Sequence, residues 1–345
     1  MPSSLNSSRS AVKNLIAAGS PISIDLGSST TKIGMRGSVV LEEPTCIVLH
    51  TSSGAVVAVG AKAQSLVGKT PPSLNCIFPI QQGVVAHPAA LAQYLKVILS
   101  KVLPVGNWQQ RILGVECIVG IPGDVSPARR EQLVSVLRES GLHRIKLVSQ
   151  PVALVKSMVK QPALTESYLV LDIGGQTVGA SIFSGGDIFR SKTLSWGGVH
   201  FTQLVQDQVK DHHGCVIGWH EAEKTKINVG TVPLISDGKQ IKPAALRKYS
   251  VRGKDTVSQL SKTVVVASTL LEQVFGDYVQ ELVNELELFC LDVPSEMLTS
   301  ALEQGIFITG GGSQVEGIAL VLSQEFHCQV HASTHPTSDT ALGLL

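Results

Sequence analysis

Residues Ile24–Thr31 read Ile-Asp-Leu-Gly-Ser-Ser-Thr-Thr, an apolar run that ends in an aspartate and a glycine-led turn. Residues Leu171–Thr177 read Leu-Asp-Ile-Gly-Gly-Gln-Thr and repeat that pattern in the second half of the chain. A third turn at Ile308–Ser313 reads Ile-Thr-Gly-Gly-Gly-Ser. Glycines let the backbone bend so that consecutive N–H groups converge on an anion. Together the three turns predict a nucleotide held between two similar halves.

The patterns around the first two turns also repeat. Strand, turn and strand begin at Ile22–Leu26 and again at Tyr168–Ile173, and helical stretches follow each unit. Val257–Cys290 is expected to hold two long helical stretches. This repetition predicts an α/β fold of two domains related by duplication.

The expected organisation follows from these patterns and from the breaks at glycine and proline. Each domain is expected to carry a smaller subdomain, and the C-terminal segment is expected to return towards the first domain. The expected bounds are an N-terminal tail at 1–20, domain I at 21–150 with its subdomain at about 45–75, and domain II at 151–345 with its subdomain at about 195–256.

Composition narrows the class of protein. The 345 residues are 43% hydrophobic and 16% charged with a net charge of +1, which suits a well-packed chain of two domains. No long basic run supports nucleic-acid binding. The six cysteines are scattered without metal-ligand spacing, which predicts buried free thiols in a reducing compartment. No segment reads as a membrane span or a signal peptide, so a cytoplasmic location is expected.

The ordered set of motifs resembles the actin-like ATPase superfamily, and within it the bacterial actins of the MreB type. The resemblance runs from Ile22 to Leu344 and implies an actin-like fold, with two duplicated α/β domains around a central nucleotide cleft. Beyond the three turns it rests on Glu43-Pro44, Gly60–Ala63, Gly68–Pro71, Ile77–Pro79, Gly83–Ala86, Val119–Pro122, Arg129-Arg130, the helix Ala222–Ile227 and the closing Thr340–Gly343.

The resemblance implies ATP and Mg²⁺ as cofactors. Asp25 and Asp172 match the carboxylates that organise Mg²⁺ through water, and with Thr177 they are the expected catalytic residues. Glu223 and Lys226 match a helix that reaches the ribose and adenine, although their charge run also fits a solvated helix face. The other expected nucleotide contacts are Gly27, Ser28, Ser29, Thr30, Gly174, Gly175, Gln176, Gly310, Gly311 and Gly312.

The chain departs from the family pattern where hydrolysis would occur. Counting from Pro122, Arg129 stands where MreB proteins place a water-orienting glutamate, and Val178 and Gly179 replace polar neighbours of the γ-phosphate. In-line attack on a γ-phosphate depends on a positioned water, so we expect ATP binding with weak hydrolysis. A local slip of the alignment leaves Glu131 as an alternative water-orienting residue.

The resemblance also implies partners. Subunits of this family stack head-to-tail into filaments, which in MreB pair antiparallel on the inner membrane surface and serve cell shape or intracellular organisation. The apolar face of Ala11–Ala18 and the loop around Trp108 are candidate membrane contacts, and both also fit packing against the protein itself. Two alternatives stay open: a non-polymerising adaptor that has lost its ATPase cycle, and a small-molecule kinase with Asp124 as its base.

Overall fold

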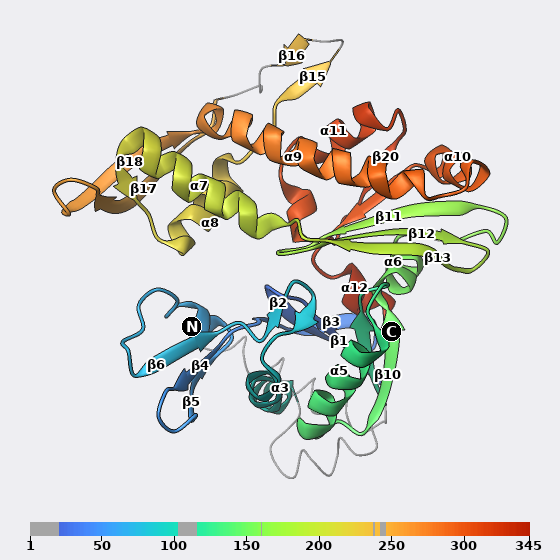
Figure 1. The fold of residues 1–345 in the computed structure, drawn as a ribbon, viewed down its shortest axis with the longest axis horizontal. Coiled ribbons are helices and arrows are strands. Elements are labelled where there is room, and N and C mark those ends of the chain that lie inside the picture. The colour runs from blue at the N-terminus through green and yellow to red at the C-terminus, as the bar shows by residue number, and fades with distance from the viewer. Residues whose placement is uncertain (1–20, 103–115, 160, 237–238, 242–245) are drawn as a thin grey trace, which may run out of the picture. The chain divides into compact units, whose positions relative to one another are not determined.

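The structure is a computed structural model that describes residues 21–102, 116–159, 161–236, 239–241 and 246–345. These residues form two compact units, which Figure 1 shows as ribbons. Unit 1 comprises the chain up to Gln161 together with Ser338–Leu345, and unit 2 comprises Pro162–Thr337. Both units mix helices with strands, which confirms the predicted α/β class.

A five-stranded sheet in the order β10-β9-β1-β2-β3 is the centre of unit 1. β1 pairs antiparallel with β2 and parallel with β9. The carboxyl ends of β1 and β9 therefore lie at one edge of the sheet. The strands are β1 (Ile22–Leu26), β2 (Thr30–Met35), β3 (Ser38–Pro44), β9 (Glu116–Ile121) and β10 (Arg144–Ser149).

Helices cover both faces of this sheet. Side chains alternate between the two faces along each strand, so apolar residues on both faces need a helix to pack against. Val119 on β9 belongs to the core that contains Leu95 and Leu137, whereas its neighbour Ile118 packs with Ala153 and Leu344. The first face carries α3 (Pro88–Val102) and α5 (Pro127–Glu139), and the second carries α6 (Gln150–Met158) and the C-terminal α12 (Asp339–Gly343).

Unit 2 repeats this arrangement with a sheet in the order β13-β12-β11-β19-β20. As in unit 1, three antiparallel strands precede two parallel ones, and the first strand after the chain enters the unit lies in the middle. The duplication predicted from the sequence is thus present in the strand order. The strands are β11 (Ser167–Ile173), β12 (Val178–Ser184), β13 (Asp187–Leu194), β19 (Ile306–Thr309) and β20 (Val330–Ala332).

The helices of unit 2 pack around the core that contains Leu171, Phe201 and Phe275. The longest of them, α9, appears in orange in Figure 1 and contributes Phe275, Val279 and Leu282 to this core. The helices are α7 (Gly198–His213), α8 (Trp219–Val229), α9 (Ser268–Leu291), α10 (Ser295–Gln304) and α11 (Ile318–Glu325), with a short 3₁₀ helix η1 (Gly311–Gln314).

Smaller sheets accompany each unit. In unit 1, a sheet in the order β5-β4-β6 packs with α2 (Ala61–Gln64) through Cys46, Val48 and Ala63. In unit 2 the corresponding sheet is β14-β17-β18. The remaining strands are β4 (Ile47–His50), β5 (Val56–Val59), β6 (Leu74–Ile77), β7 (Ile80–Gln81), β8 (Val84–Val85), β14 (Cys215–Val216), β15 (Leu234–Ser236), β16 (Lys239–Ile241), β17 (Lys248–Asp255) and β18 (Ser261–Ala267).

Two sequence-based expectations differ from the structure. The expected pair of helices in Val257–Cys290 is wrong: its first part is β18, and one helix, α9, follows. The run Thr263–Val266 consists of β-branched residues, which favour a pleated strand over a helix. The unit boundary also lies at Pro162 and not at 151, because α6 packs on the sheet of unit 1 through Ala153.

Other features of the described residues concern cysteines and the membrane. None of the six cysteines, all of which lie in the described ranges, forms a disulfide; Cys46, Cys117, Cys215 and Cys290 are buried as expected, and Cys76 and Cys328 are partly exposed. Within the described ranges, no helix has both the length and the apolar character needed to cross a bilayer. The segments Ala11–Ala18 and Pro104–Trp108 lie outside the described residues.

Candidate functional site

The first glycine turn joins β1 to β2 at the carboxyl end of β1. The Gly27 N–H donates to the Thr30 carbonyl at 3.2 Å, and a Cβ on Gly27 would lie 2.7 Å from that oxygen. Any larger residue would therefore open the turn. Ser28 accepts a hydrogen bond from the Gly83 N–H at 3.0 Å, and the Thr45 hydroxyl donates to the Gly27 carbonyl at 2.7 Å. These bonds hold the turn in one conformation.

Asp25 lies two residues before this turn and is 8% exposed. Burial raises its pKa above the ordinary value of 3.8, and the Lys32 ammonium opposes that shift. The Gln150 side-chain amide, at the start of α6, donates to Asp25 Oδ1 at 3.2 Å. The carboxylate is thus oriented by Gln150 of α6 and carries a desolvation cost that a nearby cation would offset.

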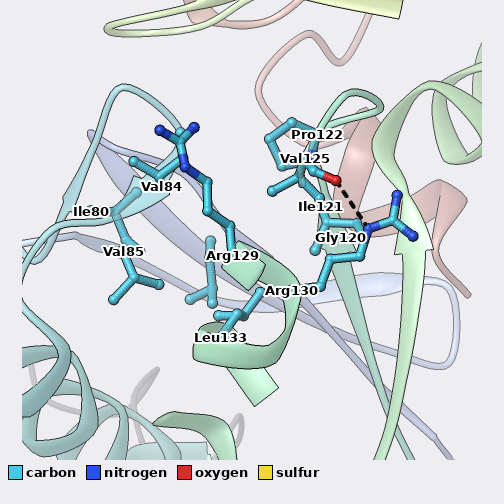
Figure 2. Close-up of a pocket in the computed structure, with 12 residues that line it drawn as sticks. Ile80, Val84, Val85, Gly120, Ile121, Pro122, Val125, Arg129, Arg130 and Leu133 are labelled. Atoms are coloured by element: carbon cyan, nitrogen blue, oxygen red, sulfur yellow. Dashed lines mark hydrogen bonds between the residues drawn. The ribbon is translucent and has the colours of Figure 1, made fainter. Parts of the chain in front are cut away.

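A pocket in unit 1 lies at the same sheet edge as the first turn. Its lining includes Leu26 at the end of β1, Pro122 after β9, and Gly83 in the β7–β8 turn. Figure 2 shows Arg129 extending beside Val84 in this pocket. The neighbouring Arg130 donates from Nε to the Val125 carbonyl at 3.2 Å and so braces the loop that precedes α5.

The helix α5 explains why Arg129 and not Glu131 lines this pocket. Ser126 caps the helix by accepting from the Arg129 N–H, and Pro127 occupies the first turn. Arg129 and Leu133 are four residues apart and share a helix face, and both line the pocket. Glu131 lies about 200° around the helix from Arg129 and is not among the residues that line the pocket. The geometry thus favours Arg129 as the residue at this position.

The second glycine turn joins β11 to β12 in unit 2 and has the same internal bond as the first. The Gly174 N–H donates to the Thr177 carbonyl at 2.9 Å, and a Cβ on Gly174 would lie 3.0 Å from that oxygen. The carbonyls of Gly174 and Gly175 accept from the first N–H groups of α7, those of Gly198 and Val199, at 3.0 and 2.7 Å. The start of α7 therefore fixes the two peptide groups of the turn that follow Gly174 and Gly175.

The third glycine turn lies directly against the second, because β19 is the parallel neighbour of β11. Gly310 has φ 84°, and a Cβ there would lie 2.5 Å from Asp172 Oδ1. A Cβ on Gly312 would lie 2.6 Å from the Ile173 side chain. Glycine is required at both positions by this close approach, which places Gly310 beside the carboxylate of Asp172 and Gly312 beside Ile173.

Glu223 and Lys226 on α8 face α7 and form a small network. Lys226 Nζ donates to Glu223 Oε2 at 2.8 Å, to the Thr202 hydroxyl at 3.1 Å and to the Gly198 carbonyl at 3.0 Å. Lys226 is only 12% exposed and Glu223 37% exposed, so the pair is not a freely solvated helix face. Lys226 also lies near the third turn, since a Cβ on Gly198 would be 3.7 Å from Lys226 Nζ and 3.9 Å from Gly312 Cα.

One sequence-based interpretation needs correction. Val178 was expected beside the γ-phosphate, but its side chain is fully buried in the core of unit 2. Strand alternation explains this, because Val178 points to the opposite face of β12 from Gly179. Gly179 lies directly across from Asp172 in the strand pairing, so its lack of a side chain does bear on the surroundings of that carboxylate.

The structure therefore gathers the predicted residues into two groups. Asp25 and the turn Gly27–Thr30 lie together in unit 1. In unit 2, the structure brings together Asp172, Gly174, Gly175, Gln176, Thr177, Glu223, Lys226, Gly310, Gly311 and Gly312.

Sequence reasoning missed the residues that brace these groups. The contact of Thr45 with Gly27 spans 18 positions in the sequence, that of Gln150 with Asp25 spans 125, and that of Thr202 with Glu223 spans 21. No local sequence pattern marks contacts over such separations. The Gly197-Gly198 pair stands at the start of α7. Its contact with the second turn depends on tertiary structure.

The duplicated sheets, each with a glycine turn after an aspartate-bearing strand, define the actin-like fold class. The crystal structure of MreB5 of Spiroplasma citri bound to AMPPNP matches with a TM-score of 0.85 at 23% identity, covering 94% of this chain and 95% of that one. The MamK double helical filament matches with a TM-score of 0.74 at 19% identity, covering 94% and 97%.

Sequence comparison gives a narrower assignment. The cell shape-determining protein Mbl of Bacillus subtilis (strain 168) is 28% identical over 323 residues, which are 93% of this chain and 93% of that protein. The family described as MreB/Mbl protein matches residues 19–345. This chain belongs to the MreB/Mbl family, which confirms the resemblance seen in its motifs.

Proposed function

We propose that this protein binds Mg·ATP and polymerises into actin-like filaments that serve cell shape. The observation that carries the proposal is the same glycine turn built twice, after Asp25 and after Asp172, with Gly310–Gly312 against the second copy. Relatives support each part: MreB5 has been solved with AMPPNP and with ADP, MamK as a double helical filament, and Mbl is described as cell shape-determining.

The glycine turn of each unit is suited to bind phosphate. The turns Gly27–Thr30 and Gly174–Thr177 would each bind phosphate oxygens of ATP through backbone N–H groups, as nests of this kind do. Glu223 and Lys226 would contact the nucleoside beside Gly310–Gly312. Because Lys226 already bonds Gly198 and Glu223, nucleotide binding would exchange some of these contacts for ligand contacts.

The aspartates fit Mg²⁺ better than a tightly caged metal. The described residues contain no cluster of three or more His, Cys, Asp or Glu side chains suited to a metal. Mg²⁺ keeps several waters and binds through one or two carboxylates and the substrate phosphates. Asp25 and Asp172 are each suited to bind a hydrated Mg²⁺ beside their own glycine turn, and the ion would neutralise charge on the phosphate oxygens.

Hydrolysis would be slow in this protein. Arg129, not a carboxylate, lines the pocket beside the first turn, and an arginine does not accept a proton from an attacking water. Its guanidinium is suited instead to bind phosphate oxygens. Binding and hydrolysis of ATP would then be uncoupled, with filaments persisting in the ATP state.

The location and higher-order assembly extend this proposal. Filaments would lie in the cytoplasm, pair antiparallel and contact the inner membrane surface through Ala11–Ala18 or the Trp108 loop. A flotation assay with liposomes tests the membrane contact, because Trp108→Ala should reduce the fraction of protein that floats if Trp108 inserts at the interface.

The binding proposal is tested by calorimetry with AMPPNP and Mg²⁺. Asp172→Ala should weaken binding at least about tenfold, or about 1.4 kcal/mol. Asp187→Ala is the matched control, because Asp187 is an exposed aspartate at the start of β13 in the same sheet. Equal affinities for the wild type and Asp172→Ala would overturn the assignment of this carboxylate.

A further inference from the structure

Two buried aromatic rings lie behind the second glycine turn. Trp196 precedes α7 and Tyr278 lies on α9; their rings stack with centroids 4.4 Å apart and planes 13° apart. The Trp196 indole N–H donates to the Tyr278 carbonyl at 2.9 Å, and Phe201 packs edge-on against both rings. The pair is thus fixed by stacking, by a hydrogen bond and by the surrounding core.

The Tyr278 hydroxyl holds the backbone of a single residue, Gly197. It accepts from the Gly197 N–H at 3.0 Å and donates to the Gly197 carbonyl at 3.4 Å. Burial raises the pKa of Tyr278, so the hydroxyl keeps its proton and its donor function throughout the physiological range. A side chain of α9 therefore fixes the residue that immediately precedes α7.

Gly197 in turn is packed against the second glycine turn. A Cβ on Gly197 would lie 2.6 Å from the Gly175 carbonyl oxygen. The next two N–H groups, those of Gly198 and Val199, donate to the carbonyls of Gly174 and Gly175. In a trans peptide the carbonyl and the following N–H point in opposite directions. The start of α7 therefore directs the N–H groups of Gly175 and Gln176 away from itself.

We infer that Tyr278 is a positioning residue for the phosphate-binding turn Gly174–Thr177. Its hydroxyl fixes Gly197, Gly197 fixes the start of α7, and the first N–H groups of α7 set the peptide planes whose opposite sides would face a phosphate. The expected consequence, tighter binding of the nucleotide phosphates, rests on the proposed function. The orientation of the turn itself is independent of any ligand.

The chain offers a matched control for the loss of this hydroxyl. Tyr168 is also buried in unit 2, accepts from the Ala163 N–H at 2.9 Å and donates to Glu166 Oε2 at 2.7 Å. It lies near the opposite end of β11 from the turn. Tyr168→Phe and Tyr278→Phe thus remove comparable hydrogen bonds from the same unit, and only the second removes a bond to the segment that holds the turn.

The first experiment measures hydrogen–deuterium exchange in the ligand-free protein. Tyr278→Phe should speed exchange of the Gly198 and Val199 amides by about fivefold, the effect of losing one hydrogen bond. Tyr168→Phe should leave these amides unchanged. Trp196→Phe is the second variant: it keeps an aromatic ring beside Tyr278 but removes the indole donor, and it should raise the same exchange by a smaller factor. Wild-type exchange in Tyr278→Phe would overturn the inference.

The second experiment measures the affinity for Mg·ATP. It should fall about fivefold in Tyr278→Phe and stay unchanged in Tyr168→Phe, whereas a role in general stability alone would lower both equally. If the wild type binds no ATP while exchange at α7 rises in Tyr278→Phe, the proposed function fails and the positioning role stands. If ATP binds equally to the wild type and Tyr278→Phe, the proposed function stands and the consequence inferred for Tyr278 fails.

Discussion

Arg129 is the residue at which we expect a single substitution to raise turnover. It shares a pocket with Leu26 and Gly83, next to the first glycine turn, and the resemblance to MreB proteins predicts a water-orienting glutamate at its position. Arg129→Glu should raise phosphate release by about tenfold or more, within the range for a positioned acid–base group. A phosphate-release assay with saturating Mg·ATP measures this, and calorimetry with AMPPNP checks that binding is retained.

Glu131→Ala is the control for this prediction, because Glu131 lies on the same helix but points away from the pocket. It should leave turnover unchanged. If Glu131→Ala abolishes phosphate release and Arg129→Glu does not raise it, Glu131 is the water-orienting residue after all.

The sequence indicated the positions of some individual residues and not of others, and the difference has physical reasons. Counting from Pro122 was enough to place Arg129, because a strand end and a capped helix start fix the register between them. Counting was not enough for Val178, since alternation along β12 decides which neighbour of the turn enters the core. Tyr278 gave no signal at all, because its contact with Gly197 spans 81 positions.

At the scale of elements, the C-terminal helix α12 is held on α6 by a close backbone approach. A Cβ on Gly343 would overlap the Ala153 carbonyl, and Ser157 donates to Asp339 Oδ1 at 3.2 Å across the same pair of helices. Gly343→Ala should therefore lower the free energy of unfolding by about 1–3 kcal/mol, the usual cost of overpacking. The midpoint of urea unfolding, followed by circular dichroism, measures the change.

Gly218→Ala serves as the comparison, because a Cβ there would meet no atom within 4 Å and its φ of −73° suits any residue. Its effect should be well below that of Gly343→Ala. Equal midpoints for the wild type and Gly343→Ala would show that α12 does not depend on this approach.

Elements with strong local signals were predicted well and those decided by tertiary contacts were not. The glycine turns and their flanking strands follow from apolar runs that end in Asp and Gly. β18 was missed because the whole of Val257–Cys290 was expected to be helical despite its β-branched run, and that strand pairs with β17 along its whole length. Similarly, α6 could be assigned to unit 1 only once Ala153 was seen to pack on Ile118.

At the scale of the whole molecule, membership of the MreB/Mbl family leads to an expectation about assembly. Repeated heterologous contacts that do not close into a ring generate open filaments. With ATP bound but slowly hydrolysed, the interface contacts of each subunit would stay in the nucleotide-bound state. We therefore expect pelleted protein and visible filaments with Mg·ATP, and filaments that last as long with ATP as with AMPPNP.

Sedimentation and negative-stain electron microscopy over several hours test this expectation, with Arg129→Glu as the comparison. If slow hydrolysis is what preserves the filaments, Arg129→Glu should disassemble in ATP at a rate that follows its phosphate release, and should remain assembled in AMPPNP. Wild-type filaments that disassemble in ATP but not in AMPPNP would mean that hydrolysis proceeds at an ordinary rate. Monomers under all nucleotide and salt conditions would instead support the adaptor alternative, in which the fold is retained and polymerisation is lost.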